Sequence, residues 1–136
     1  MTITLNGTTG IVSPKVNALD LELDSKNVVE RGSNANGEYV RFADGTQICT
    51  MSRLQTSAIN NAYGSLYQDT TLWDFPAQFI DPPSVSCGLG KWGTGASWSG
   101  LGASPSVSSA SLRVWDAVSR GSGELSLSAT AIGRWY

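Results

Sequence analysis

Apolar and polar side chains alternate strictly near the C-terminal end of this chain, and this period of two constrains the fold more than any other feature. Successive side chains of a β-strand point to opposite faces, so the pattern predicts strands with one buried face. Two segments show it, 107–118 and 124–135, and Gly121-Ser122-Gly123 connects them. The residues expected to face inward are Ala110, Leu112 and Val114 in the first strand and Leu125, Leu127, Ala129 and Ala131 in the second.

A β-hairpin is predicted around Ala43-Asp44-Gly45, which separates the β-rich runs EYVRF and TQICT. A three-residue loop sets Phe42 opposite Thr46 and Val40 opposite Ile48, whereas a two-residue loop would set Phe42 against Gln47. The three-residue loop is expected because it keeps apolar residues together on one face. The second face would then carry Tyr39, Arg41, Gln47 and Cys49.

The segment FPAQFIDPPSVSC, residues 75–87, cannot be a helix. Pro76 lacks an N–H, and Pro82-Pro83 favours extended backbone in the residue before it. We expect Phe75 and Phe79 to fix a short crossing segment to the core. A strand with Val85 and Cys87 on one face should follow.

Six strands are predicted in all, which is the pattern of an all-β, six-stranded antiparallel β-sandwich. Their expected ranges are 38–42, 46–54, 69–75, 83–90, 107–118 and 124–135. Apolar residues do not recur at a regular spacing in residues 52–68, so a loop is expected there, with a helical turn at 57–62. The glycine-rich stretch 88–105 is expected to be a mobile loop that carries Trp92 and Trp98.

Composition argues against several classes of partner. The net charge of −2 gives no excess of positive charge with which to bind nucleic acid. No apolar run approaches the ~20 residues of a membrane span, and none forms a leader. The chain has no histidine and no CxxC spacing, so neither a metal site nor a cofactor is expected. Cys49 and Cys87 are either a single disulfide or two free thiols.

The lack of histidine also removes most enzyme mechanisms, because Ser-His-Asp and Cys-His pairs cannot form. A hydrolase with two carboxylates remains conceivable, but the acidic residues are scattered singly among turn residues. They are Glu22, Asp24, Asp44, Asp69, Asp74, Asp81, Asp116 and Glu124. We therefore expect a protein that is not an enzyme.

The order of motifs resembles the C-terminal, receptor-binding tip domains of bacteriophage and prophage tail fibres. It consists of GSNANGEYVRFADGTQIC, then LWDFPAQFIDPPSVSC, a Ser/Gly-rich loop and a terminal ATAIGRWY, over about residues 32–136. The pattern FPxxFxxxPxV in the second motif also resembles the core of H-type lectins, which are trimeric six-stranded sandwiches. The resemblance implies a homotrimer in the virion tail fibre that contacts other tail proteins and presents its distal loops to the host.

Residues 1–31 match no part of this resemblance and are expected to form an N-terminal stalk, with the lectin-like domain at 32–136. Leu19, Leu21 and Leu23 alternate with acidic residues there, so they predict a strand whose leucine face needs a partner surface. Two further copies of the chain would supply that surface.

Five residues are candidates for ligand binding: Lys91, Trp92, Trp98, Arg113 and Trp115. A tryptophan face can stack on the apolar side of a sugar ring while charged neighbours bind its hydroxyls. Each tryptophan could instead have a structural role, Trp92 and Trp98 by covering the sandwich edge or trimer axis, and Trp115 by contacting another subunit. Trp135 and Tyr136 are expected to tie down the chain end.

The leading hypothesis is a tip that binds a bacterial surface receptor, a glycan, without catalysis, and the alternative is a purely structural trimeric knob or collar.

Overall fold

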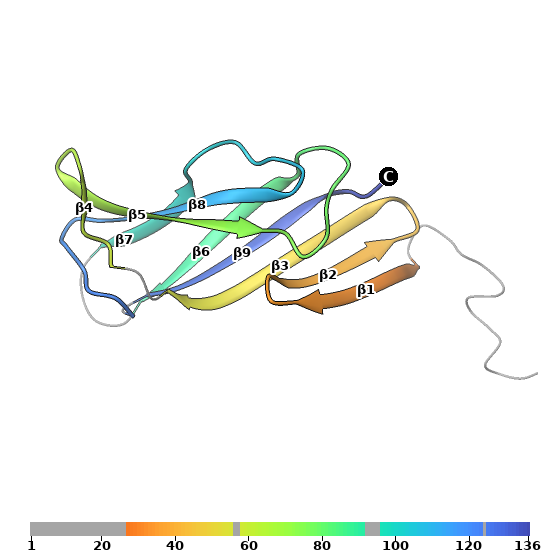
Figure 1. Ribbon diagram of the computed structural model, residues 1–136, viewed down its shortest axis with the longest axis horizontal. Helices are drawn as coiled ribbons and strands as arrows, with labels where there is room; N and C mark the ends of the chain where they lie inside the picture. The colour runs from red at the N-terminus through yellow and green to blue at the C-terminus, as the bar shows by residue number, and fades with distance from the viewer. Residues whose placement is uncertain (1–26, 56–57, 92–95, 124) are drawn as a thin grey trace, which may run out of the picture.

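The protein folds into two antiparallel β-sheets packed face to face (Figure 1). The structure is a computed structural model, and it describes residues 27–55, 58–91, 96–123 and 125–136. No helix occurs among these residues, which agrees with the all-β fold expected from the sequence. The predicted stalk, including Leu19, Leu21 and Leu23, lies outside the described residues except at its last positions.

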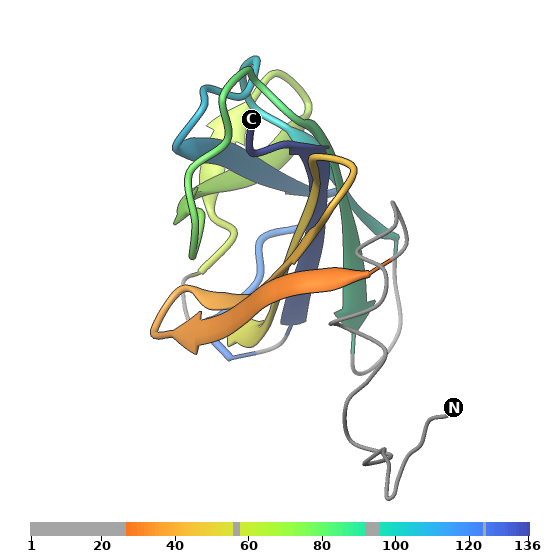
Figure 2. The ribbon, with the colours of Figure 1, turned by 90° about the vertical axis from the view of Figure 1, so that its right-hand side faces the viewer.

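The larger sheet has five strands in the order β1-β2-β3-β9-β6, and the smaller has four in the order β4-β5-β8-β7. The strands of the larger sheet are β1 (Val28–Asn34), β2 (Gly37–Phe42), β3 (Thr46–Gln55), β9 (Leu125–Arg134) and β6 (Ser84–Lys91). Those of the smaller are β4 (Asn61–Tyr63), β5 (Leu66–Asp74), β8 (Ser109–Asp116) and β7 (Ser97–Leu101). Figure 2 shows β1 twisted well away from the direction of β9 and β6.

All six predicted strands are present, and the described residues contain three more, so the expected count of six needs correction. Strand β1 forms a hairpin with β2 and begins at Val28, before the boundary expected at residues 31 and 32. Residues 52–68 are not simply a loop, since they hold the end of β3, all of β4 and the start of β5. The glycine-rich stretch also contains strand, because β6 extends to Lys91 and β7 begins at Ser97.

The β2–β3 hairpin has the predicted register. Val40 pairs with Ile48 and Tyr39 with Cys49, and the Gly45 N–H donates a hydrogen bond to the Phe42 carbonyl at 3.0 Å. Gly45 has φ +92°, a left-handed conformation that glycine adopts without a steric penalty. A residue with a side chain would be strained at this loop position.

The core between the sheets contains the inward residues predicted from both C-terminal strands, and all seven are buried. Three aromatic rings fill its centre: Trp73 meets Phe75 edge-to-face at 5.0 Å, and Phe75 meets Phe79 likewise at 5.1 Å. The Phe75 and Phe79 N–H groups donate to the carbonyls of Ser108 and Val107. The crossing segment is therefore fixed by packing and main-chain hydrogen bonds, as expected.

Cys49 and Cys87 are both free thiols, which resolves the alternative that the sequence left open. Cys49 pairs with Ala131, and Cys87 pairs with Ala129, on opposite sides of β9. Strands two positions apart in a sheet are separated by about 9.5 Å, and a disulfide needs Cα atoms within about 7 Å. The strand between the two cysteines therefore prevents a bond.

The C-terminus is tied to the β2–β3 loop, as expected from the sequence. The Trp135 indole N–H donates to the Phe42 carbonyl at 3.0 Å, and the Tyr136 hydroxyl donates to the Ala43 carbonyl.

Candidate functional site: an aromatic face on the smaller sheet

Trp98 and Trp115 lie directly opposite each other on β7 and β8. Their ring centroids are 6.5 Å apart and the ring planes are 20° from parallel, so the two indoles form a stacked pair. Trp98 is 42% exposed and Trp115 is half-buried. Because Leu112 and Val114 of β8 point into the core, Trp115 points outward, and the pair lies on the outer surface of the smaller sheet.

Arg113 occupies the same outer surface two residues before Trp115. It pairs across the sheet with Thr70 of β5 on one side and Gly100 of β7 on the other. Its Nε donates a hydrogen bond to the Thr70 hydroxyl at 3.2 Å, and its guanidinium lies 5.5 Å from the centre of the Tyr63 ring. A hydroxyl and an aromatic ring therefore hold this cation in place without neutralising it.

The lack of a side chain at Gly100 leaves space for the Trp115 ring. A Cβ built on Gly100 would lie 3.2 Å from Cζ3 of Trp115, closer than ordinary van der Waals contact. Glycine thus allows the indole of β8 to approach the backbone of β7.

We call this surface the tryptophan face and define it by outward-pointing residues of all four strands of the smaller sheet. They are Tyr63, Gln68, Thr70, Trp98, Arg113 and Trp115. The face combines exposed aromatic rings with one cation and neutral polar groups, and such a surface can stack on a sugar ring and bind its hydroxyls.

The structure brings three of the five candidate residues together on this face: Trp98, Arg113 and Trp115. Lys91 ends strand β6 of the other sheet, and its side chain lies outside the described part of the chain, as does all of Trp92. Sequence reasoning placed Arg113 and Trp115 on one face correctly but assigned Trp98 to a loop. Tyr63, Gln68 and Thr70 were missed, because an isolated polar or aromatic residue carries no signal of which strand will lie beside it.

The carboxylate of Asp116 is buried on the inner side of the smaller sheet, opposite the tryptophan face. It is completely buried, and its oxygens accept hydrogen bonds from the Ser97 hydroxyl, from the Val118 N–H at 2.9 Å and from Arg120 Nε at 2.8 Å. Burial alone would raise the pKa of this carboxyl, but these donors and the Arg120 charge outweigh burial and lower the pKa to about 2. Asp116 is therefore ionised at neutral pH and links β7, β8 and the loop that follows.

A second polar cluster lies on the inner side of β1 and β2. The Tyr39 hydroxyl donates to Glu30, and Arg41 donates to Glu30 Oε1 at 3.0 Å and to Gln47 Oε1 at 2.7 Å. Gln47 in turn donates to the Ala77 carbonyl at 2.9 Å. Hydrogen bonds from Tyr39 and then Arg41 lower the pKa of Glu30, and the bond to Glu30 raises the pKa of Tyr39. These groups satisfy one another, as in a structural network.

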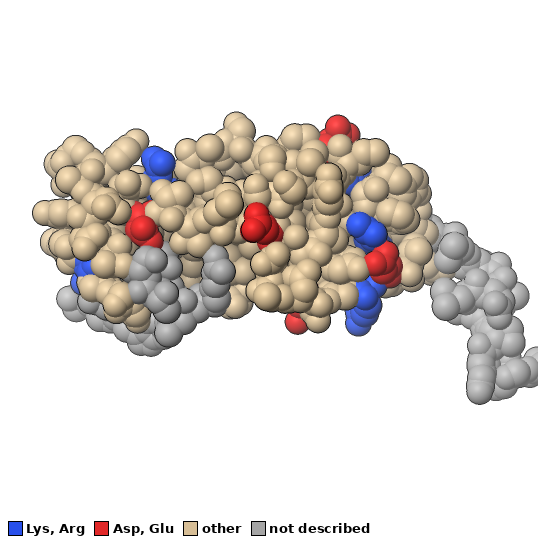
Figure 3. All heavy atoms as spheres, viewed as in Figure 1, with Lys and Arg blue, Asp and Glu red and all other residues tan. Residues whose placement is uncertain are grey.

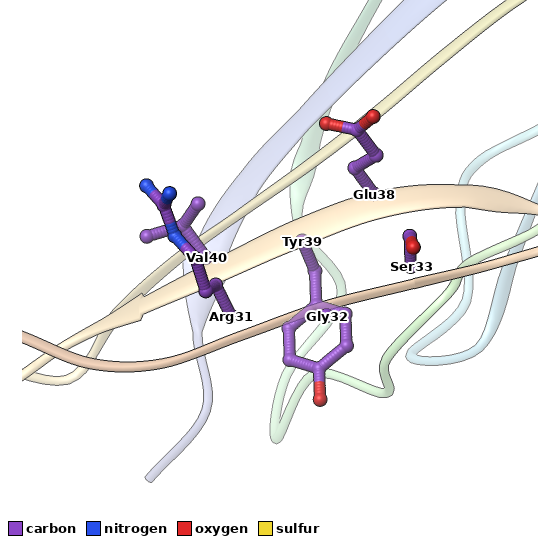
Figure 4. A pocket seen from close by; sticks show the side chains of 6 residues that line it. All are labelled: Arg31, Gly32, Ser33, Glu38, Tyr39 and Val40. Atoms are coloured by element: carbon purple, nitrogen blue, oxygen red, sulfur yellow. The ribbon is translucent and has the colours of Figure 1, made fainter.

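A shallow open hollow of about 340 Å³ adjoins this cluster between β1 and β2. Figure 4 shows the Tyr39 ring beside Gly32 on one side of the strands, while Arg31 and Glu38 extend to the other. Because its lining residues do not converge on one space, the hollow is a weaker candidate than the tryptophan face.

Charged side chains form small separate groups on the view in Figure 3. Within the described ranges, no three His, Cys, Asp or Glu side chains gather as a metal site would require. The same residues include no helix that could cross a bilayer.

Comparison with known proteins finds similarity of structure only. No family model matches the sequence, and no curated protein does. The structure of the P. aeruginosa R1 pyocin fibre comprising C-terminal residues 323–701 superposes with a TM-score of 0.55 at 15% identity, covering 77% of this chain and 28% of that chain. An N-truncated R1-type pyocin tail fibre gives a TM-score of 0.53 at 16% identity, with 77% and 86% covered. At such low identity the likeness establishes the fold: this chain is built like part of a pyocin tail fibre and spans about a quarter of the longer fragment.

Proposed function

We propose that this protein is the receptor-binding tip of a tail fibre and that it binds a glycan on the bacterial surface through the tryptophan face, without catalysis. The observation that carries the proposal is the outward-facing Trp98–Trp115 pair with Arg113 beside it. A monomeric sheet gains nothing from leaving a large aromatic pair in water, so such a patch is typical of a binding surface.

The geometry suits a weak sugar site. A stacked indole pair presents a flat apolar surface to the C–H side of a pyranose, and Gln68, Thr70 and Arg113 offer hydrogen-bonding groups beside it. The fold shared with pyocin tail fibres supports a place in a tail fibre, and hence in a virion or a related particle. An organisation like that of H-type lectins is part of the same proposal.

We also propose that three copies assemble around a common axis next to other tail proteins. On the outer face of the larger sheet, Val40, Ile48 and Ile132 form a row across β2, β3 and β9, and Ile132 is 48% exposed. The leucines at positions 19, 21 and 23 of the sequence supply further apolar groups for burial between copies. Three weak sites on one tip raise the apparent affinity for a repetitive surface by orders of magnitude.

Binding of the purified protein to host cells and to a glycan array tests this function. Trp98→Ala and Trp115→Ala should each reduce glycan binding about fivefold or more, since stacking on an aromatic ring contributes on the order of 1 kcal/mol or more. Val118→Ala is the matched control, because Val118 is an exposed apolar residue that is not part of the tryptophan face. Light scattering should give the mass of a trimer.

Two outcomes favour other functions. Failure of the unmodified trimer to bind any host surface would favour the structural knob or collar. Release of reducing sugar from host polysaccharide would indicate a hydrolase and contradict binding without catalysis.

A further inference from the structure

We propose that the tryptophan face selects acidic glycans, with a sugar carboxylate or phosphate bound by the guanidinium of Arg113. This inference rests on the proposed glycan-binding function and adds the chemical class of the ligand. It follows from the unusual surroundings of this arginine.

Arg113 is half-buried, and none of the described residues is an acidic partner for it. Among the residues that the structure describes, two arginines form ion pairs, Arg41 with Glu30 at 3.0 Å and Arg120 with Asp116 at 2.8 Å. The contacts of Arg113 are instead neutral, namely the Thr70 hydroxyl and the Tyr63 ring. Its positive charge is thus available to a ligand.

These contacts also orient the guanidinium. Of its five N–H donors, the one on Nε is bound by Thr70, and no described residue accepts a hydrogen bond from the four on the terminal nitrogens. Two parallel N–H groups match the two oxygens of a carboxylate or phosphate, and such bidentate pairs are among the strongest hydrogen-bonded contacts in proteins. An arginine held from both sides loses little side-chain entropy when it binds.

The spacing fits one sugar unit. Arg113 and Trp115 are two residues apart on β8, which is about 6.6 Å along a strand. A pyranose stacked on the indole pair could therefore place an acidic substituent on Arg113. Asp74, which pairs with Ser109, is the next acidic residue on the outer side of β5, and four strand positions, about 13 Å, separate Ser109 from Arg113. No carboxylate of the face itself competes for the cation.

The test uses pairs of glycans that differ in charge alone. The first pair is a uronic-acid-containing bacterial polysaccharide and its carboxyl-reduced, neutral form. The second is lipopolysaccharide core oligosaccharide before and after dephosphorylation. Binding to the unmodified protein, Arg113→Gln, Arg113→Lys and Arg31→Gln is measured at low and at high salt. Arg31 is the matched control, since it is an exposed arginine on β1 of the other sheet.

The unmodified protein should bind the acidic member of at least one pair ten- to a hundredfold more tightly, and high salt should reduce that preference. Arg113→Gln should abolish the preference while keeping weak binding of the neutral form, Arg113→Lys should keep part of it, and Arg31→Gln should keep all of it. The pair that shows the preference identifies carboxylate or phosphate as the bound group.

Equal binding of both members of each pair by the unmodified protein, or a preference that survives in Arg113→Gln, would overturn the inference while leaving the glycan-binding function intact. Loss of both acidic and neutral binding in Trp98→Ala would support that function separately. If the unmodified protein bound none of these glycans, the inference would be wrong, and the glycan array and host cells would decide the glycan-binding function. Equal melting temperatures of the variants would exclude misfolding as the cause of any loss.

Discussion

The Ser97 hydroxyl on β7 donates a hydrogen bond to the buried carboxylate of Asp116 on β8, and this pair directly adjoins the stacked Trp98 and Trp115. The inner surface at this end of the sheet is therefore polar and charged, while the outer surface is aromatic. Whatever weakens the ionised carboxylate should loosen the edge strand that carries Trp98.

Acid should destabilise the protein through Asp116. Its pKa is about 2 in the folded state and about 3.8 when unfolded, so the stabilisation is fully present above about pH 4 and is lost as the pH falls towards 2. The shift corresponds to about 2 kcal/mol of the free energy of unfolding. Urea denaturation at pH 7, 4 and 2.5 should show a decrease confined to the acidic interval. A decrease between pH 7 and 4 that is larger than the decrease between pH 4 and 2.5 would contradict this assignment.

Asp116→Asn should lower the free energy of unfolding at neutral pH by about 3 kcal/mol, because it removes the carboxylate beside a mostly buried Arg120. The variant should also lose the part of the acid response that belongs to Asp116. Asp81→Asn is the control, since Asp81 is exposed, and it should change stability by less than about 0.5 kcal/mol. A variant as stable as the unmodified protein would show that the buried ion pair contributes nothing net.

Phe79→Ala should be among the most destabilising single changes in the crossing segment. Phe79 is 2% exposed and packs edge-to-face on Phe75, so its removal leaves a cavity and should cost about 3–5 kcal/mol. Ile80 is 57% exposed, and Ile80→Ala should cost less than about 0.5 kcal/mol. Chemical denaturation of the two variants measures the difference, and similar losses would mean that the segment is packed in another way.

Both cysteines should react as free thiols once the chain is unfolded. Burial raises the pKa of the Cys49 thiol, so this residue should not react with Ellman's reagent in the folded protein. After unfolding without reductant, two thiols per chain should react, since neither cysteine is bonded. A single titration experiment, with and without denaturant, checks both statements, and fewer than two reactive thiols after unfolding would reveal oxidation or bonding.

The parts of the fold that the sequence predicted are those encoded within one strand or one hairpin. Alternation alone identifies the inner faces of β8 and β9, and turn chemistry at Gly45 identifies the register of β2 on β3. Strand β1 was missed because its sequence, VVERGSN, has no apolar face. Glu30 is exposed, and it accepts hydrogen bonds from Tyr39 and Arg41, partners that only the folded sheet reveals.

Only part of the candidate site was predicted, because only part of it is encoded within one strand. Arg113 and Trp115 are two residues apart on one strand, so their common face follows from the period of two. The stacking of Trp98 on Trp115 depends on how β7 pairs with β8. The glycines around Trp98 suggested a loop, whereas one of them, Gly100, makes room for the partner ring.

Gly100→Ala should therefore disturb the tryptophan face more than the fold. The new methyl group would lie 3.2 Å from the Trp115 ring, so the ring must shift and the indole pair should separate. We expect altered tryptophan fluorescence and a severalfold loss of glycan binding, with a change in stability of about 1 kcal/mol or less. Gly88→Ala is the matched control, since its methyl group would meet Ser128 at an ordinary 3.5 Å on the other sheet. Unchanged fluorescence and binding in Gly100→Ala would mean that the ring position does not depend on the glycine.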